Sequence, residues 1–350
     1  MIRVKCPLEV VRLNGKIQEK GWAGYDFVPT LLAMMPCPLK VPVEEDFARR
    51  EEAGEWAGFD TSRIVFEGNA TQTGFYEQVK AYRHEDELPE LIISPGISSF
   101  FHSDFREKFL ERGVFADVTD GWRGNPRFGN LELVDPKGWY TVLCVNPLVM
   151  VADLTRLDGL PVPRSWAELL KPEWSRRVNM RGKNNKDFCE TTLLTLRHVF
   201  GPEAVERFGE SVKDGLHPAQ MVKLAGTGHA DAPAVSVMPY FYAKTIPRKD
   251  KTAIIWPEEG AIASPVFLLA KAASRERLQP LTDYLTGPGV SALYENACFP
   301  ALNPSVESKL PPDAKLMWMG WDLVWHEDIG SVKLDTEERF MRGYCKGRSL

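Results

Sequence analysis

Short apolar runs alternate with amphipathic segments along most of this chain of 350 residues. Runs such as Leu91–Ile93 are short and β-branched, which is typical of buried strands, whereas 188–200 repeats apolar residues at helical spacing. This alternation predicts an α/β fold with mostly parallel sheets. The expected strands are 27–35, 63–66, 91–93, 139–151, 178–180, 234–238, 253–256 and 262–270. The expected helices include 43–48, 75–82, 101–112, 188–200, 202–213 and a pair within 275–297.

The order of these segments predicts a clamp of two lobes. The strand over 139–151 crosses into a second lobe, and the strand over 262–270 returns to the first. Loops at the carboxyl ends of the strands would then form a ligand cleft that shuts by hinge closure. The predicted division is an N-terminal extension over 1–26, lobe one over 27–138 plus 260–305, lobe two over 139–259 and a C-terminal helical segment over 306–350.

Four sequence motifs follow one another in a recognisable order. Pro89–Ser94 reads as an acidic-apolar strand, and Trp166–Leu169 gives a Trp-x-x-Leu pattern before the Pro-Glu-Trp turn at 172–174. Gly228-x-x-Asp231 precedes a strand, and Trp256–Ala261 reads Trp-Pro-Glu-Glu-Gly-Ala. In this order they resemble the type II solute-binding proteins of ABC importers, in the branch that carries iron(III), polyamines, thiamine and oxyanions. The resemblance covers about residues 28–305. It implies a periplasmic-binding-protein-like clamp that captures a small anionic or metal-associated ligand for an ABC permease.

Basic and amide side chains follow the strand over 178–180. We expect Arg181, Lys183 and Asn184 to clamp an anion, with the N-terminus of a helix that begins near Asp187 behind them. Backbone N–H groups and positive side chains both favour anions. The alternative is an ordinary strand–helix loop whose basic side chains are solvated.

Lobe one offers candidates at the equivalent loops. Ser98 and Ser99 would donate hydroxyl and backbone N–H groups to the ligand, or would only cap the next helix. Lys40 and Cys37 lie in a turn stiffened by Pro36 and Pro38, after the first strand. Their position in the topology makes them candidates for the cleft.

Tyr240 and Tyr242 follow the strand over 234–238. The resemblance implies that two adjacent tyrosines bind iron(III) here, but Phe241 separates this pair. Alternate residues of an extended segment point to opposite faces, which argues against direct iron binding. The two phenols would ligate a hard cation, bond an oxyanion or carboxylate, or simply pack at the strand end. No other cofactor is expected.

Composition narrows the choice of function. With a net charge of −5 and no basic field, the chain is not expected to bind nucleic acid, and no apolar stretch approaches the about 20 residues of a membrane span. Six histidines and six cysteines are scattered without metal-site spacing. Cys144 lies in an apolar strand and is expected to be a buried, reduced thiol. Trp318, Trp321 and Trp325 suit a packed helix better than a partner-binding surface.

Two alternative functions remain open from the sequence. One is an enzyme on the same fold with Cys37 or Cys189 as a nucleophile, as in other two-lobed proteins. Another is a cytoplasmic sensor or carrier. Met1–Lys20 lacks the apolar core of a secretory signal, so we expect a cytoplasmic protein, or an exported one whose signal lies outside this sequence. The protein is expected to be a monomer.

Overall fold

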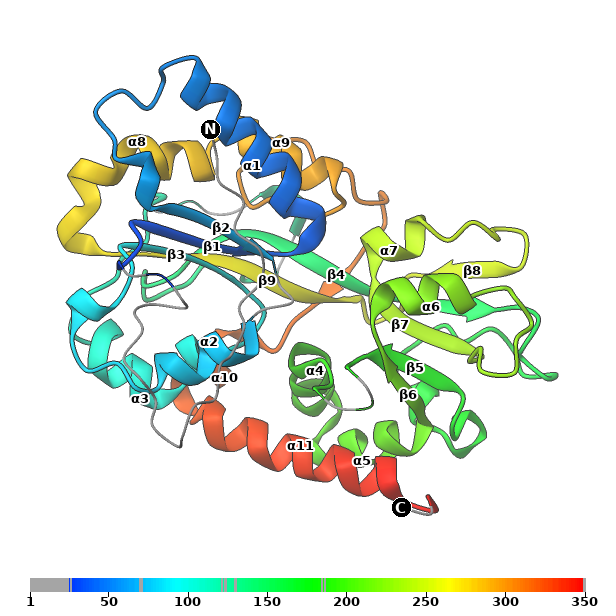
Figure 1. Cartoon of the computed structure of the whole chain (residues 1–350). Helices are drawn as coiled ribbons and strands as arrows, with labels where there is room; N and C mark the ends of the chain where they lie inside the picture. The colour runs from blue at the N-terminus through cyan, green and yellow to red at the C-terminus, as the bar shows by residue number, and fades with distance from the viewer. Residues whose placement is uncertain are drawn as a thin grey trace, which may run out of the picture.

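The computed structural model describes residues 25, 27–68, 72–120, 122, 125–128, 131–183, 185 and 187–348. The predicted N-terminal extension therefore lies outside the described residues, apart from Tyr25. The chain forms two α/β lobes joined by long strands, as Figure 1 shows.

The described strands form one mixed sheet with the order β2-β1-β3-β9-β4-β7-β5-β6. In lobe one, β1 pairs in parallel with β2 and β3, and β3 pairs antiparallel with β9. In lobe two, β5 pairs in parallel with β6 and β7, while β7 and β8 pair antiparallel with β4. The bounds are β1 Leu31–Met35, β2 Ile64–Gly68, β3 Leu91–Pro95, β4 Thr141–Asp153, β5 Val178–Arg181, β6 Val212–Leu216, β7 Val235–Pro239, β8 Thr252–Ile255, β9 Ala261–Ala270 and β10 Leu316–Met317, which pairs with β9.

Helices cover both faces of this sheet (Figure 1). On lobe one they are α1 Cys37–Glu52, α2 Gln72–Val79, α3 Ser103–Phe105, α8 Arg275–Thr286, α9 Pro288–Asn296 and α10 Gly320–His326. On lobe two they are α4 Glu190–Phe200, α5 Pro202–Ser211, α6 Pro218–Leu224 and α7 Tyr240–Lys244, with α11 Ile329–Cys345 packed beneath them.

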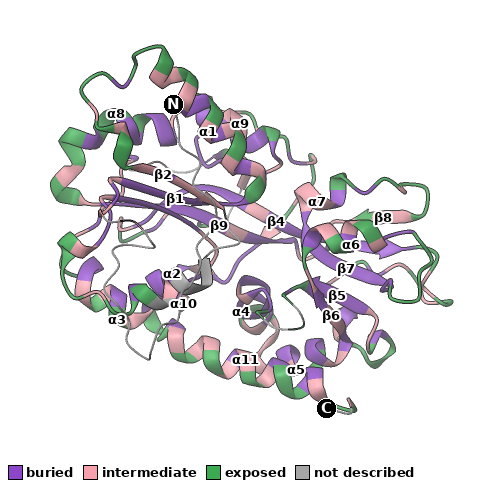
Figure 2. Cartoon of the chain, in the orientation of Figure 1, coloured by how far each residue is buried: buried purple, intermediate pink, exposed green. Residues whose placement is uncertain are grey.

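The central strands of the sheet, such as β1, β3, β4, β7 and β9, are buried on both faces, which explains their continuous apolar sequence, whereas β2, β6 and β8 are only partly buried. Leu32 and Met34 of β1 belong to one core of lobe one, and the alternate residues Leu31, Ala33 and Met35 belong to the core on the other face. Lobe two repeats this arrangement with two further cores around β4 and β7. Figure 2 shows these strands as the buried centre of the molecule.

Strands β4 and β9 join the two lobes. They pair antiparallel from Thr141↔Leu268 to Leu148↔Ile262, after which β4 continues beside β7 in lobe two. Near the middle of this pairing Asn146 lies opposite Ser264, and each is followed by a proline. The Pro265 carbonyl accepts from Gly96 N, so the backbone polar groups of this proline point to β3 and its missing N–H does not interrupt the pairing with β4.

The C-terminal segment contacts both lobes. Trp318, Trp321 and Trp325 are buried in a lobe-one core, which confirms the prediction that they pack. Further along, Phe340 and Tyr344 of α11 belong to a lobe-two core. The boundaries assigned to the lobes and to this segment stay a prediction.

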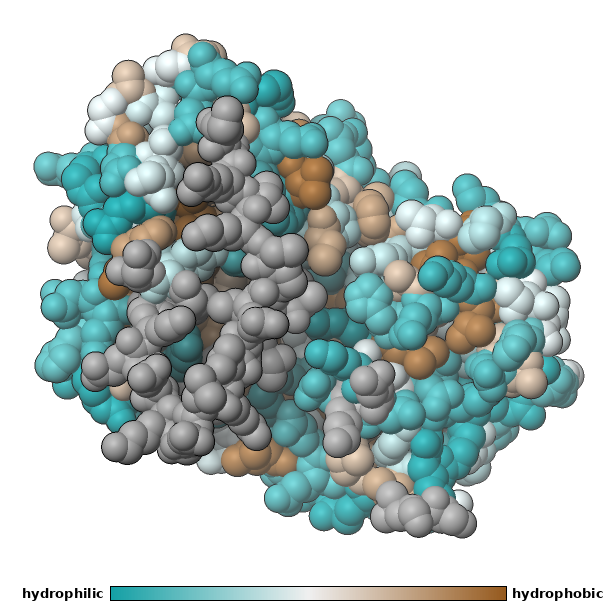
Figure 3. All heavy atoms as spheres, viewed as in Figure 1, coloured by the Kyte–Doolittle hydropathy of each residue, from teal (hydrophilic) through white to brown (hydrophobic). Residues whose placement is uncertain are grey.

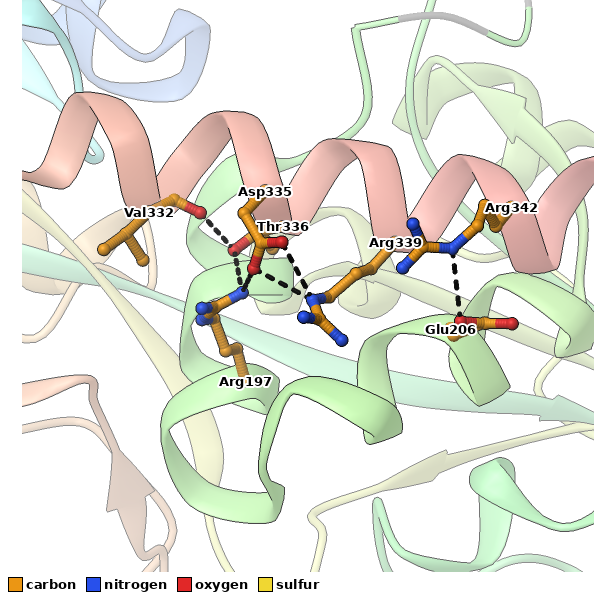
Figure 4. A network of polar contacts seen from close by, with 7 residues as sticks. All are labelled: Arg197, Glu206, Val332, Asp335, Thr336, Arg339 and Arg342. Atoms are coloured by element: carbon orange, nitrogen blue, oxygen red, sulfur yellow. Dashed lines mark hydrogen bonds and ion pairs between the residues drawn. The ribbon is translucent and has the colours of Figure 1, made fainter.

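Polar contacts fix α11 to α4 and α5 (Figure 4). Arg197 of α4 bonds the Asp335 carboxylate, which also accepts from Arg339 Nε at 2.9 Å. The bonds from Arg197 and then Arg339 lower the pKa of Asp335. Arg342 pairs with Glu206 of α5 at 3.5 Å. These contacts surround a point where α5 and α11 approach closely.

The prolines around residues 36–42 begin a helix instead of forming the predicted turn. Pro36 is the N-cap of α1, with Cys37 and Pro38 in the first turn, where a missing proline N–H costs little. The helix predicted over 101–112 is broken into α3 and a π-helical turn over Arg106–Leu110. The helix expected near Asp187 begins at Glu190, because Asp187 adopts φ +48°.

Residues 240–244 form the helix α7, so the prediction of an extended segment was wrong. Pro239, with φ −57° and ψ 139°, ends β7 and caps this helix. The Trp-x-x-Leu motif gives only a 3-10 turn over Glu168–Leu170. Sequence reasoning missed β6 and α6, whereas α11 lies within the helical segment predicted over 306–350. β6 reads Val-Lys-Asp-Gly-Leu, which is too polar for an apolar-run criterion.

The crossing of α5 and α11 depends on glycine, which gives the first test. A Cβ at Gly343 would lie 1.9 Å from Glu206 O, so Gly343→Ala is expected to lower the free energy of unfolding by about 1–3 kcal/mol. Gly289→Ala in α9 is the matched control, because its methyl would meet only the end of Arg50 at 3.4 Å. Denaturant unfolding compares the two. Equal losses would contradict a tight crossing.

Candidate ligand site between the lobes

The carboxyl ends of parallel strands from both lobes meet near the middle of the molecule. In lobe one, β1 leads into α1 at Cys37, and β3 leads into Gly96 and Ser98. In lobe two, β5 ends at Arg181, β6 is followed by His217, and β7 leads into α7. Ligands of α/β folds bind at such strand ends. This junction is therefore the candidate site.

Gly96 shows that the two lobes touch at this level. A Cβ built on Gly96 would lie 3.3 Å from Thr191 Oγ1 at the start of α4, and 3.6 Å from Ser264 Oγ of β9. The Gly96 N–H also donates to Pro265 O at 2.7 Å. The loop after β3 is thus held against the joining strand and against lobe two at once.

Hydroxyl groups form the lobe-one side of the junction. Tyr76 and Ser94 share a hydrogen bond of 2.8 Å between their oxygens. Ser98 lies beside the same phenol, is 6% exposed, and its Oγ makes no well-formed hydrogen bond within the described residues. Burial raises the pKa of Tyr76, and the charges of Glu190 and Arg181 from lobe two also act on it. These residues therefore lie within electrostatic reach of one another at the junction.

Arg181 dominates the lobe-two side. Its side chain is exposed, and no described carboxylate forms an ion pair with it. His217 and Tyr242 lie together, with ring centroids 6.2 Å apart. Partial burial and then the Arg181 charge lower the pKa of His217. Burial raises the pKa of Tyr242, to which Cys37 from lobe one contributes and which Arg181 opposes.

We call this set of residues the inter-lobe cluster. It combines one unpaired cation with phenols, hydroxyls, an imidazole and a thiol, and it draws on both lobes. Donors of this kind suit a small anion. Its members are Cys37, Tyr76, Ser94 and Ser98 of lobe one, and Arg181, His217 and Tyr242 of lobe two.

The structure brings four of the residues selected from sequence into this cluster, namely Cys37, Ser98, Arg181 and Tyr242. Lys40 pairs instead with Glu44 of its own helix at 3.4 Å. Ser99 is buried in a 3-10 turn, Lys183 is exposed, and Asn184 lies outside the described residues. The roles of all these residues stay predictions.

The two tyrosines of α7 do not converge. Tyr240 packs edge-on against Trp256, with centroids 5.3 Å apart, while Tyr242 faces His217. Successive helical residues are rotated by about 100°, so residues two apart point to different sides. Among the described residues, no group of three or more His, Cys, Asp and Glu side chains is arranged to hold a metal ion. Binding of a metal ion therefore stays a prediction, and the described residues include no such group to which it can be assigned.

Cys189 does not face the junction, contrary to the sequence-based expectation. It is the N-cap residue of α4, is 5% exposed, and belongs to a lobe-two core. Cys144 is fully buried, as predicted, and burial raises the pKa of its thiol. Of the cysteines proposed as nucleophiles, only Cys37 is exposed.

Sequence reasoning missed Tyr76, His217, Asn146 and Ser264. The last two carried a usable signal, because each is a polar residue followed by proline within an otherwise apolar run. Their register pairing places them side by side next to Gly96. Tyr76 and His217 carried no such signal, since their positions depend on tertiary packing.

Two α/β lobes, joined by long strands and meeting at a polar cluster, define the periplasmic-binding-protein class of fold. A family model described as bacterial extracellular solute-binding protein matches residues 86–326. The chain therefore belongs to this family of binding proteins, which confirms the resemblance found in the sequence. The family supports neither the enzyme nor the sensor alternative. Because the family is extracellular, the cytoplasmic expectation also has no support.

Solved structures agree on the fold. The substrate-binding protein of an ABC transporter from Agrobacterium tumefaciens matches with a TM-score of 0.61 and 14% identity, over 93% of this chain and 96% of that one. A Trichodesmium protein, IdiA or FutA, in complex with iron and citrate, gives 0.59 and 12% over 89% and 99%. Ferric iron-binding protein A of Mannheimia haemolytica, in an open conformation, gives 0.58 and 13% over 89% and 99%.

A search of curated protein sequences found no match. None of the described helices has the length and hydrophobicity that a membrane span needs. Figure 3 shows a mostly hydrophilic surface on the face it presents.

The contact at Gly96 gives a second test. Gly96 has φ +71° and Gly54 has φ +77°, so alanine at either is expected to cost about 1–2 kcal/mol of backbone strain. Only the Gly96→Ala methyl would meet the other lobe, because nothing lies within 4 Å of a Cβ at Gly54. Small-angle scattering should show a larger radius of gyration for Gly96→Ala alone. The same radius for both variants would contradict an inter-lobe contact there.

Proposed function

We propose that this binding protein captures a small anionic solute at the inter-lobe cluster by hinge closure, for import through an ABC permease. The observation that carries the proposal is the Arg181 guanidinium, which has no ion pair with a described carboxylate and whose charge reaches Tyr76 of lobe one and Tyr242 of lobe two. An exposed cation placed between hydroxyl donors fits an anion that both lobes can contact.

The chemistry of the cluster favours a carboxylate or oxyanion. A guanidinium presents paired N–H donors that match such groups, and charged hydrogen bonds are stronger than neutral ones. Tyr76 and Ser98 add hydroxyls from lobe one, so a ligand that bonds both sides favours the closed state. A solute held this way stabilises closure through its own contacts.

A bare hard cation fits the cluster less well. Such a cation needs several oxygen ligands of negative charge, and the group at the centre of the cluster is positive. A metal carried by an anionic chelator presents carboxylates instead. The Trichodesmium protein of similar fold is described in complex with iron and citrate, so citrate, with and without iron(III), belongs among the ligands to test.

Delivery to a permease follows from family membership. The family is extracellular, so we propose that the protein acts outside the cytoplasm and passes its solute to a membrane partner. A monomeric state stays a prediction.

Loss of the Arg181 charge tests the proposal directly. Native mass spectrometry with elemental analysis of the isolated protein looks for a carried solute, and calorimetric titration then measures citrate, phosphate and sulfate binding. Arg181→Met should weaken the anion that binds by about 10- to 100-fold, because a charged hydrogen bond contributes about 1.5–3 kcal/mol. Arg164→Met is the matched control, since Arg164 is exposed and pairs with Glu258 at 3.1 Å. Equal affinities in wild type and Arg181→Met would contradict the proposal.

The imidazole in the cluster predicts a pH dependence. The pKa of His217 is lowered, so the ring is neutral near pH 7 and becomes positive only below its usual range of about 6.5. Added positive charge should tighten binding of sulfate, whose charge is constant in this range, as pH falls from about 7 to 5. His217→Gln should flatten this dependence. An unchanged slope in His217→Gln would place the titrating group elsewhere.

A further inference from the structure

A partly buried ion pair between Lys333 and Glu190 lies next to the inter-lobe cluster and includes a residue of the C-terminal helix. Lys333 Nζ of α11 lies 2.6 Å from Glu190 Oε1, at the first turn of α4. Both side chains are partly buried, with 26% and 30% exposed. A second carboxylate, Glu337, lies 3.9 Å from the same ammonium. Lys333 is therefore directed to Glu190 and held near it by its own helix.

Glu190 also lies close to Arg181, because the N–H of its chain neighbour Cys189 donates to Arg181 O at 3.0 Å. Burial raises the pKa of Glu190, while Lys333 opposes that rise most strongly and Arg181 opposes it more weakly. Arg181 and Glu190 both act on the pKa of the Tyr76 phenol, Glu190 raising it and Arg181 lowering it. Glu190 is thus a carboxylate placed to compete with a ligand for Arg181.

Of these two cations, only Lys333 forms an ion pair with Glu190 in the structure. Its carboxylate is engaged by Lys333, and Arg181 has no ion pair with a described carboxylate. An ion pair between Glu190 and Arg181 would neutralise the guanidinium that the proposed ligand needs. Coulomb attraction grows as the partner approaches, so a permanent internal carboxylate is a strong competitor for a diffusing anion.

We propose that Lys333 is a positioning residue that keeps Arg181 available to the anion by holding Glu190 away from it. This inference rests on the proposed function and deepens it, since it makes the C-terminal helix a part of the ligand site. The helix is suited to this role because Arg197 and Glu206 anchor it on α4 and α5, which fixes Lys333 relative to Glu190 (Figure 4).

The test measures the availability of Arg181 without needing the ligand. Phenylglyoxal modifies free guanidinium groups, and peptide mass spectrometry reports its rate at Arg181. In Lys333→Met the released Glu190 should pair with Arg181 and slow its modification by up to about fivefold, the factor expected for a partly exposed ion pair. The double variant Lys333→Met/Glu190→Gln and the conservative Lys333→Arg should restore the wild-type rate.

Arg339→Met is the matched control on the same helix. Arg339 pairs with Asp335 at 2.9 Å, so its loss removes one α11 cation without freeing Glu190. Arg181 should be modified at the wild-type rate in this variant. A slowed rate in Arg339→Met, or an unchanged rate in Lys333→Met, would overturn the inference.

Sulfate titration of the same variants separates this inference from the proposed function. If Arg181→Met weakens sulfate binding and Lys333→Met does so to a smaller extent that the double variant reverses, both ideas hold. If Arg181→Met weakens binding but Lys333→Met leaves both binding and labelling unchanged, only the role of Lys333 fails. If Arg181→Met has no effect, the proposed site fails, whereas the labelling rates still decide which cation Glu190 takes.

Discussion

The antiparallel pairing of β4 and β9 is the constraint on which the rest of this molecule depends. These two strands belong to both lobes, so their register fixes how the lobes face each other. The parallel strands of each lobe are then ordered so that their carboxyl ends meet at the junction. Gly96 shows how closely the lobes approach in this register, since its N–H donates to Pro265 O of β9 and its α-carbon faces Thr191 of α4. Displacing the ladder by one residue would move the polar cluster out of alignment.

Few charged side chains of the described residues have been placed at the junction between the lobes. The chain has a net charge of −5, yet Arg181 at the junction has no ion pair with a described carboxylate, and Glu190 pairs with a lysine from another element. The family and the fold agree on capture of a small solute. The three solved proteins of similar fold named above share 12%, 13% and 14% identity with this chain, so the ligand must be argued from side chains of this chain.

Much of the architecture could be predicted from sequence, because double-sided burial makes strands such as β3, β4 and β9 continuously apolar. Arg181 and Tyr242 were also accessible, since residues just after such strands fall at the ligand edge of an α/β fold. Failures had local causes: β6 is polar, and Pro239 turns an expected extended segment into α7. Tyr76, His217 and the Glu190–Lys333 pair were out of reach, because each takes its meaning from a partner far away in the sequence.

The place where β4 and β9 cross between the lobes has a mechanical consequence. Asn146 and Ser264 pair there beside Gly96, so a rotation of the lobes about these two strands would have its axis at the depth of the inter-lobe cluster. Points near such an axis move little, whereas the outer rims of the lobes sweep through the largest arcs. Residues beside Asn146 and Ser264 would thus keep nearly the same positions in an open and a closed molecule. They would offer an arriving solute binding groups of constant position, and the more distant parts of the lobes would then close over it.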